Sequence, residues 1–213
     1  MATDPRPATT GRRPLRLLGA WTALLWLVTA YAPYDRGDWL LENLLVFAAV
    51  ALLALTGRRF RFSTRSYALF TAFLSLHLIG AHYTYSQTPF GFWLQDALHL
   101  SRNHYDRIVH FSFGLLLAVP FREALTRVVG VRERWSYAMV VITVLGLSGL
   151  YEATEGLVAM VVRPDLGAAW LGTQGDAWDA QKDTALAALG AAVTVGAAWW
   201  RGHRRGGAGL SRS

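Results

Sequence analysis

Three aspartates at the start of the last apolar block have the spacing most suggestive of chemistry. Asp176, Asp179 and Asp183 are three and then four residues apart, so a helix beginning near Gly175 would carry all three carboxylates on one face. Like charges on one face repel each other, and each loses solvation near a bilayer. We therefore expect a cation, a basic partner or a water-filled cavity to compensate them.

Further polar residues fall at the ends of two other apolar blocks. Asp106 and His110 are four residues apart and share a helix face, while Glu152 and Glu155 are three residues apart. A carboxylate commonly orients a ligating or catalytic imidazole. These groups and the aspartates are expected at one depth, in a single acidic pocket. Three other polar residues are expected nearby: Glu42, His77 and His82.

One interpretation of this pocket is a site for a divalent metal ion, because hard cations favour oxygen ligands and mixed histidine and carboxylate sites suit zinc, manganese or iron. The candidate ligands are Asp106, His110, Glu152, Glu155, Asp176, Asp179 and Asp183. The catalytic candidates are His110, Asp106 and Glu152, and the substrate-binding candidates are Arg107 and Lys182. One or two metal ions there would activate water or bind phosphate. No HExxH spacing is present, and no nucleotide or flavin cofactor is indicated.

Two other interpretations use the same residues. Acidic groups inside a membrane often mark a pathway for protons or cations. Alternatively, Arg107 and Lys182 pair with the acids and simply hold helices together.

Composition indicates a polytopic membrane protein. Of 213 residues, 53% are hydrophobic, and the mean hydropathy is +0.26. Six apolar blocks are each near the roughly 20 residues that cross a bilayer as a helix. They span 15–32, 39–56, 66–83, 107–125, 135–162 and 176–200. The fold class predicted is all-α, a six-helix transmembrane bundle. The chain has no cysteine, which excludes disulfides and thiolate metal sites.

Charge predicts the orientation of this bundle. The two termini and the loops after the second and fourth blocks hold 16 of the 21 basic residues, whereas 11 of the 14 acidic residues lie at the opposite ends. By the positive-inside rule, both termini are cytoplasmic. The same pattern explains the net charge of +7 without nucleic acid. The expected domains are a disordered lead over 1–14, one transmembrane domain over 15–200 and a basic tail over 201–213.

Local patterns add five expectations. Residues 90–100, in the long outer connection, form a short interfacial helix. Gly146 and Gly149 allow close helix contact. Thr173 marks the N-terminus of the last helix. The first block followed by Ala30-Tyr31-Ala32 also resembles a signal peptide, although Pro33 and the even number of blocks argue against cleavage. Small residues predict that the last helix packs at the centre of the bundle: Ala188, Gly190, Ala191, Ala192, Gly196 and Ala197.

Three segments resemble the YjdF-like family of bacterial inner-membrane proteins. They are YDRIVHFSFG at 105–114, Tyr151-Glu152 with Glu155, and LGTQGDAWDAQKD at 171–183. This resemblance covers nearly all of the chain. It implies a multi-pass protein of the bacterial plasma membrane, but it implies no activity.

A fainter resemblance is to VanZ-like membrane proteins, whose pattern joins Asp-Lys and His on one helix to a glutamate and an aspartate on two others. Asp106 and His110 take comparable places, with Arg107 where that pattern has lysine. Glu152 or Glu155 would be its glutamate, and Asp179 or Asp183 its aspartate. This resemblance implies a cell-envelope role with membrane lipids and an amphipathic or lipid-linked substrate as partners. The expected function is metal-dependent hydrolysis or transfer, and the alternatives are a small proton- or cation-coupled transporter or a non-catalytic membrane interaction protein.

Overall fold

The computed structural model describes residues 11–57 and 59–207, with the side chains of 202–207 left out. All regular secondary structure in this part of the chain is helical. The helices are α1 (Arg12–Ala30), α2 (Arg36–Thr56), α3 (Thr64–His82), α4 (Pro89–Leu98), α5 (Tyr105–Arg127), α6 (Glu133–Val161), α7 (Pro164–Leu171) and α8 (Asp179–Gly207). An all-α fold is therefore confirmed.

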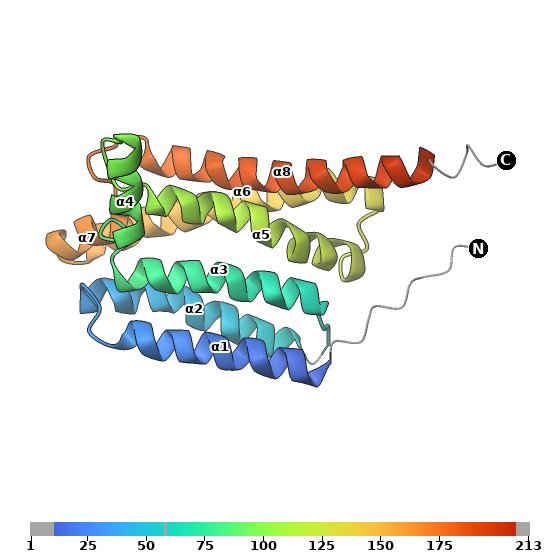
Figure 1. Cartoon of the computed structure of the whole chain (residues 1–213), viewed down its shortest axis with the longest axis horizontal. Coiled ribbons are helices and arrows are strands. Elements are labelled where there is room, and N and C mark those ends of the chain that lie inside the picture. The colour runs from blue at the N-terminus through green and yellow to red at the C-terminus, as the bar shows by residue number, and fades with distance from the viewer. Residues whose placement is uncertain (1–10, 58, 208–213) are drawn as a thin grey trace.

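The long helices lie side by side, and the short ones gather at one end (Figure 1). Helices α4 and α7 lie at the same end as the α1–α2 connection and the start of α8. The opposite end holds the start of α1, the end of α8 and the α2–α3 and α5–α6 connections. Helix α5 packs against α3, α6 and α8. It is therefore the helix through which the two halves of the bundle meet.

Each of the six predicted blocks corresponds to one long helix, and the short helix expected over 90–100 is α4. Helix α7 was not predicted, because its eight residues are too few to show a periodic pattern. The disordered lead predicted for 1–14 lies mainly outside the described residues, and its last part belongs to α1. Part of the predicted tail, 208–213, also lies outside them.

Within the described residues, three helices are long and apolar enough to cross a membrane: α2, α5 and α6. Helix α1 carries Arg12, Arg13 and Arg16 in its first two turns, and α8 begins with Asp179, Lys182 and Asp183. These charges lower the apolar character of two further helices of comparable length. Helix length and composition thus support three membrane crossings, not all six that were predicted.

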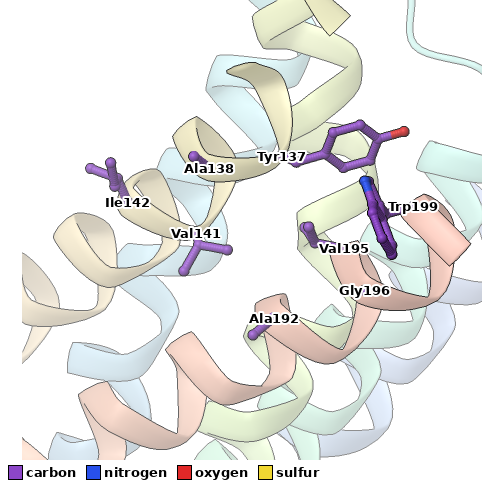
Figure 2. A pocket seen from close by; sticks show the side chains of 8 residues that line it. All are labelled: Tyr137, Ala138, Val141, Ile142, Ala192, Val195, Gly196 and Trp199. Carbon is purple, nitrogen blue, oxygen red and sulfur yellow. The ribbon is translucent and has the colours of Figure 1, made fainter. Parts of the chain in front are cut away.

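Large apolar side chains cover much of the outer surface of the bundle. Leu44 and Leu52 on α2 and Leu150 and Leu157 on α6 are each more than 60% exposed, as expected for a surface whose solvent is lipid. Between α6 and α8 this surface is hollowed into an open apolar groove of about 500 Å³ (Figure 2). Residues of both helices line it, including Val141 and Gly196.

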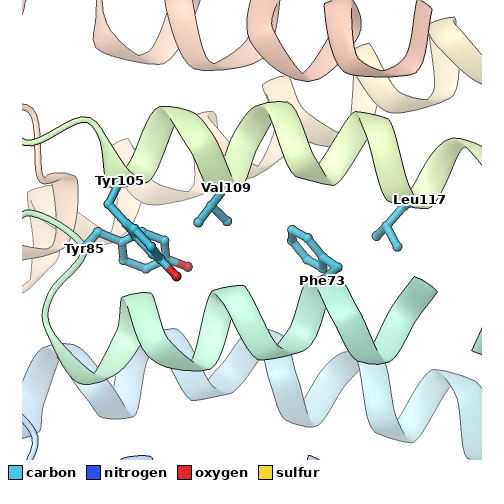
Figure 3. Packing of buried hydrophobic residues seen from close by; sticks show 5 residues of the cluster. All are labelled: Phe73, Tyr85, Tyr105, Val109 and Leu117. Atoms are coloured by element: carbon cyan, nitrogen blue, oxygen red, sulfur yellow. The ribbon is translucent and has the colours of Figure 1, made fainter. Parts of the chain in front are cut away.

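The core has two main parts, one on each side of α5. On the α3 side of α5, Phe73 of α3 packs with Val109 and Leu117 of α5 and with Tyr85 and Tyr105 (Figure 3). Facing α6 and α8 is a second cluster, formed by Ala118, Val140, Val144, Ala187 and Ala191. Helices α5 and α8 approach to backbone contact at two glycines.

The two glycines can be replaced by nothing larger without a shift of main chain. A Cβ atom at Gly114 would lie 1.8 Å from the carbonyl oxygen of Ala187, and one at Gly190 would lie 2.1 Å from that of Phe111. Close packing of the small-residue face of α8 is confirmed at Gly190 and Ala191. The predicted central position of α8 is wrong, because α8 packs mainly against α5 and α6 and lies at one edge of the bundle (Figure 1). Gly146 has no neighbour within 4 Å of an added Cβ, so the expectation of close contact there is wrong.

A polar cluster ties α5 to α3 at the end opposite α4. Glu123 accepts hydrogen bonds from the Ser63 amide and hydroxyl, both at 2.8 Å, and from the Ser66 hydroxyl at 2.5 Å. Arg127 pairs with the same carboxylate. Since Ser63 also caps the start of α3, this cluster fixes where α3 begins relative to α5.

The close approach of α5 and α8 predicts that Gly→Ala at two positions on α8 changes the free energy of unfolding differently. Gly190→Ala should lower the free energy of unfolding by about 2 kcal/mol, because its Cβ meets main-chain atoms of α5. Gly196→Ala meets nothing within 4 Å and should be neutral or stabilising by roughly 0.5–1 kcal/mol, because alanine favours the helix. Unfolding of the two variants in detergent, followed by circular dichroism, measures the difference; equal midpoints would contradict the contact.

Candidate metal centre

The segment before α8 is a turn, and it places Asp176 outside the helix. Gln174 and Gly175 have φ angles of +49° and +85°, which a helix does not allow. Helix α8 begins at Asp179, so the prediction of a helix starting near Gly175 with Thr173 at its N-terminus is wrong. Asp179 and Asp183 remain four residues apart on one helix face.

Two loops hold the starts of α5 and α8 together. The Asn103 amide donates to Oε1 of Gln174 at 3.1 Å, and Nε2 of Gln174 donates to the Asn103 carbonyl at 2.9 Å. Arg102 also donates to the carbonyl of Thr173 at 2.7 Å. Residues 69 or more apart in the sequence are thereby fixed side by side. The polar residues in the first turns of α5 and α8 must consequently face each other.

Asn103 is itself held by α4 and by its own helix. Its Nδ2 donates to the Thr88 carbonyl at 3.0 Å, and its Oδ1 accepts from the Tyr105 amide at 3.0 Å. A Cβ at Gly91 would lie 1.7 Å from Oδ1 of Asn103, so α4 can lie this close only with glycine there. Helix α4 thus supports the loop that positions the site.

The predicted acidic residues divide into two groups, and the first is neutralised by basic side chains. Arg102 binds Asp179 through both nitrogens of its guanidinium tip, at 2.6 and 3.3 Å. Arg107 pairs with Asp176 and contacts Oδ1 of Asp179 at 3.1 Å. Lys182 lies 2.6 Å from Asp176. Three cations therefore face two carboxylates here.

Two ionisable groups in these loops respond to their neighbours. Hydrogen bonds from Lys182, the Trp178 amide and Arg107 hold the pKa of Asp176 well below its ordinary value of 3.8. Burial, together with the charge of Arg107, lowers the pKa of His104. A neutral His104 ring can accept the hydrogen bond that joins its Nδ1 to Nη1 of Arg107 at 3.1 Å. This contact orients Arg107 toward the aspartates.

The second group lies one turn deeper, where no described lysine or arginine forms an ion pair with it. Ligand atoms of Asp106, His110 and Asp183 lie within 4.8 Å of one another. Nε2 of His110 is 3.6 Å from Oδ1 of Asp106 and 3.3 Å from Oε1 of Glu152. Helices α5, α6 and α8 thus each contribute a carboxylate to one small volume around an imidazole.

Two carboxylate oxygens in this volume lack hydrogen bonds. Oδ1 of Asp183 and Oε1 of Glu152 are buried and have no hydrogen-bond partner within the described residues, and Asp183 is only 1% exposed. Burying an unpaired carboxylate oxygen is costly unless a proton or a metal ion compensates it. The arrangement can therefore hold a cation or share protons. Glu155, buried one turn beyond Glu152 on α6, adds a further acid to this region.

A buried hydrogen-bonded chain adjoins this group on the α2 and α3 side. Nε2 of His77 lies 3.1 Å from the Glu42 carbonyl, which can only accept, so Nδ1 accepts from the Tyr85 hydroxyl at 2.5 Å. Tyr151 of α6 donates to Oε2 of Glu42 at 3.2 Å. Glu42 and His77 are thus on the same side of the bundle as the candidate ligands, as expected. His82 instead bonds the Thr29 carbonyl, at 2.9 Å.

Several residues that help to build the site were not predicted from the sequence. Arg102 pairs with Asp179, Asn103 and Gln174 join the two loops, and Ser148 lies 3.4 Å from Nδ1 of His110. Arg102 carried a usable signal, because few basic residues lie on the acid-rich side of the chain. Ser148 carried none, since serine on an apolar helix usually bonds its own backbone.

Comparison with known proteins agrees with this picture of a membrane protein. Residues 14–204 match the model of a family described as predicted membrane protein (DUF2238). The chain belongs to this family. It is 39% identical to inner membrane protein YjdF of Escherichia coli (strain K12) over 173 aligned residues. The aligned region covers 81% of this chain and 82% of that protein. No solved structure matches the chain significantly.

The family confirms the predicted YjdF-like resemblance and the location in the inner membrane as a multi-pass protein. The resemblance to VanZ-like proteins stays a prediction.

The ion pairs between the loops predict unequal costs for removing two basic residues. Arg102→Met leaves Asp179, whose side chain is 5% exposed, with Arg107 alone and should lower the free energy of unfolding by about 3 kcal/mol. Lys182→Met removes a half-exposed partner and should cost less than about 1 kcal/mol. Chemical unfolding in detergent measures both variants, and equal losses would show that the buried pair is not the stronger one.

Proposed function

We propose that this integral membrane protein binds a divalent cation through Asp106, His110 and Asp183, with Glu152 completing the site. The cation serves hydrolysis or group transfer on a lipid or cell-envelope substrate. One observation carries the proposal: ligand atoms from two helices converge within 4.8 Å. Ligands about 2.1 Å from one ion would lie roughly 3–4 Å apart, so small side-chain movements suffice to close the site.

Charge supports a cation rather than a further ion pair. The three described basic side chains near the site are engaged by Asp176 and Asp179. Asp106, Asp183 and Glu152 have no such partner, and two of their buried oxygens lack hydrogen bonds. A divalent ion would compensate two of these charges in the space between the helices. This choice of ligands also favours an oxygen-rich coordination sphere with one imidazole, which suits manganese, iron or zinc.

Each residue has a role in the proposed chemistry. Asp106, His110 and Asp183 hold the ion, and Ser148 accepts from Nδ1 of His110, as an outer hydrogen bond to a ligating imidazole commonly does. A bound ion lowers the pKa of its water and stabilises charge on a phosphoryl or carbonyl oxygen. Glu152, within 3.3 Å of Nε2 of His110, serves as the fourth ligand or takes the proton from that water.

The remaining predicted residues take positioning or binding roles in this proposal. Asp176 and Asp179 fix the loops through their ion pairs rather than contacting the ion. Lys182 is half exposed, and it would meet an anionic substrate at the edge of the site together with Arg107. Glu155 is an outer carboxylate that does not bind the ion directly.

A second candidate function is proton-coupled transport, which the buried chain of Tyr85, His77, Glu42 and Tyr151 favours. Nε2 of His77 bonds the main-chain carbonyl of Glu42 and lies 3.9 Å from Oε2 of its carboxylate. A small side-chain movement would join the imidazole to the carboxyl group, and acids inside a membrane often pass protons. Under this alternative the orphaned oxygens of Asp183 and Glu152 carry protons. The protein would then bind no divalent ion.

We further propose that all six long helices cross the membrane, with both termini in the cytoplasm. The bias of basic residues toward one end of the bundle supports this orientation. The cysteine-free chain offers a clean test with a membrane-impermeant thiol reagent. Ser101→Cys, exposed at the site end, should react in intact cells. Val129→Cys, 68% exposed at the other end, should react only after permeabilisation; the reverse pattern would overturn the orientation.

Metal analysis tests the site directly. The purified protein should hold about one divalent ion per chain, and Asp183→Asn should lower the affinity at least roughly tenfold because it removes a buried ligand. Asp165→Asn is the matched control, since this aspartate lies on α7 at the same end with a side chain 71% exposed. Its ion content should equal that of the parent protein.

Two outcomes would count against the metal site. A parent protein that binds no divalent ion after incubation with manganese, iron and zinc would favour the proton-coupled alternative. Equal binding by the parent and Asp183→Asn would move the ion elsewhere. Thermal unfolding without added metal shows whether Asp183→Asn is folded, and His110→Gln provides a second ligand variant.

A further inference from the structure

The face of the bundle between α6 and α8 opens beside the candidate site. A second groove, of about 460 Å³, lies between these helices and is lined by Gly149, Ala153, Ala180, Ala185 and other residues of the same pair. Glu152 lines it as well. The carboxylate that stands 3.3 Å from His110 therefore belongs both to the site and to a groove on the outer surface.

The two grooves follow one line along the helix pair. On α6 the lining residues Ala138, Ile142, Leu145, Gly149 and Ala153 recur every three or four positions, which places them on a single face. The stretch from 138 to 153 is roughly 22 Å long, most of the roughly 30 Å of a hydrocarbon core.

Side chains from both helices border the groove farther from the site (Figure 2). The two grooves thus lie one after the other on this face, and the one nearer the site reaches Glu152.

Small residues line these two grooves without bringing the helices into close contact. A Cβ at Gly196 would meet nothing within 4 Å, and one at Gly149 would meet only Thr184, at 3.9 Å. By contrast, Gly190 on the opposite face of α8 is filled by the backbone of α5. The space at Gly149 and Gly196 therefore serves no helix contact within the described chain. Each groove lies in the range of roughly 300–1,000 Å³ usual for ligand sites.

We propose that an amphipathic lipid with a phosphate headgroup reaches the site sideways between α6 and α8. Its headgroup lies at the cation beside Glu152, and its acyl chain lies along the two grooves. This rests on the proposed metal site, because an anion would be repelled by Asp106, Asp183 and Glu152 alone. The occupant is lipid because α6 is one of the helices suited to span the membrane, and its groove side faces outward.

Photolabelling in lipid nanodiscs tests the groove. The protein is placed in phosphatidylcholine discs with a few per cent of a phosphatidic acid that carries a diazirine in its acyl chain. After irradiation, adducts should concentrate at lining residues such as Leu145 and Ala153. Gly149→Leu places a large side chain in the groove beside Glu152 and should lower labelling about tenfold.

Gly19→Leu is the matched control, because it adds the same side chain to the exposed surface of α1, where nothing lies within 4 Å of an added Cβ and where neither groove is lined. Equal labelling of the two leucine variants overturns the groove. A dimer that Gly149→Leu dissociates would also overturn it, because a second copy of the chain would then be the occupant.

The headgroup is tested separately. Chelation should lower labelling by the phosphatidic acid probe and leave labelling by a diacylglycerol with the same diazirine unchanged. Equal effects on both probes overturn the headgroup contact. Both leucine variants should retain the bound ion, which is measured in the same samples. A parent protein that holds the ion but is not labelled at the groove thus refutes this inference alone, whereas absence of the ion from the parent protein refutes the proposed function.

Discussion

The backbone contact between α5 and α8 is the constraint on which the site depends. Gly114 and Gly190 let the two helices approach until main-chain atoms touch, and the loops before them are joined by the paired hydrogen bonds of Asn103 and Gln174. Two helices fixed in this way bring Asp106 and Asp183 to opposite sides of one small space. Larger side chains at either glycine would widen that space and separate the acids.

Charge in the site is arranged in two layers. In the outer layer the acids and bases pair with each other: Arg102, Arg107 and Lys182 surround Asp176 and Asp179. The inner layer contains acids without such partners and one imidazole. The outer cations form their ion pairs with Asp176 and Asp179, and none of them forms an ion pair with an inner acid. The deeper layer is where a bound ion or shared protons would have the greatest effect.

Much of the fold followed from the length and spacing of apolar blocks, and the polar residues that converge were mostly those expected. The start of α8 was not predicted, because positive φ angles at Gln174 and Gly175 depend on the neighbouring loop. The division of the acids was hidden for a related reason: Arg102 and Asp179 are 77 residues apart, and local spacing carries no information on such a pair. Helix α7 was too short to leave a pattern.

The polar cluster around Glu123 has a consequence for motion. Helix α5 is tied to α3 there through Ser63 and Ser66, and at its other end it is tied to the loop before α8 through Asn103. Sliding of α5 along its axis would break both attachments at once, so these contacts oppose such a movement. Near the site, helix α6 is attached to α2 through Tyr151 and to His110 of α5 through Ser148 and Glu152.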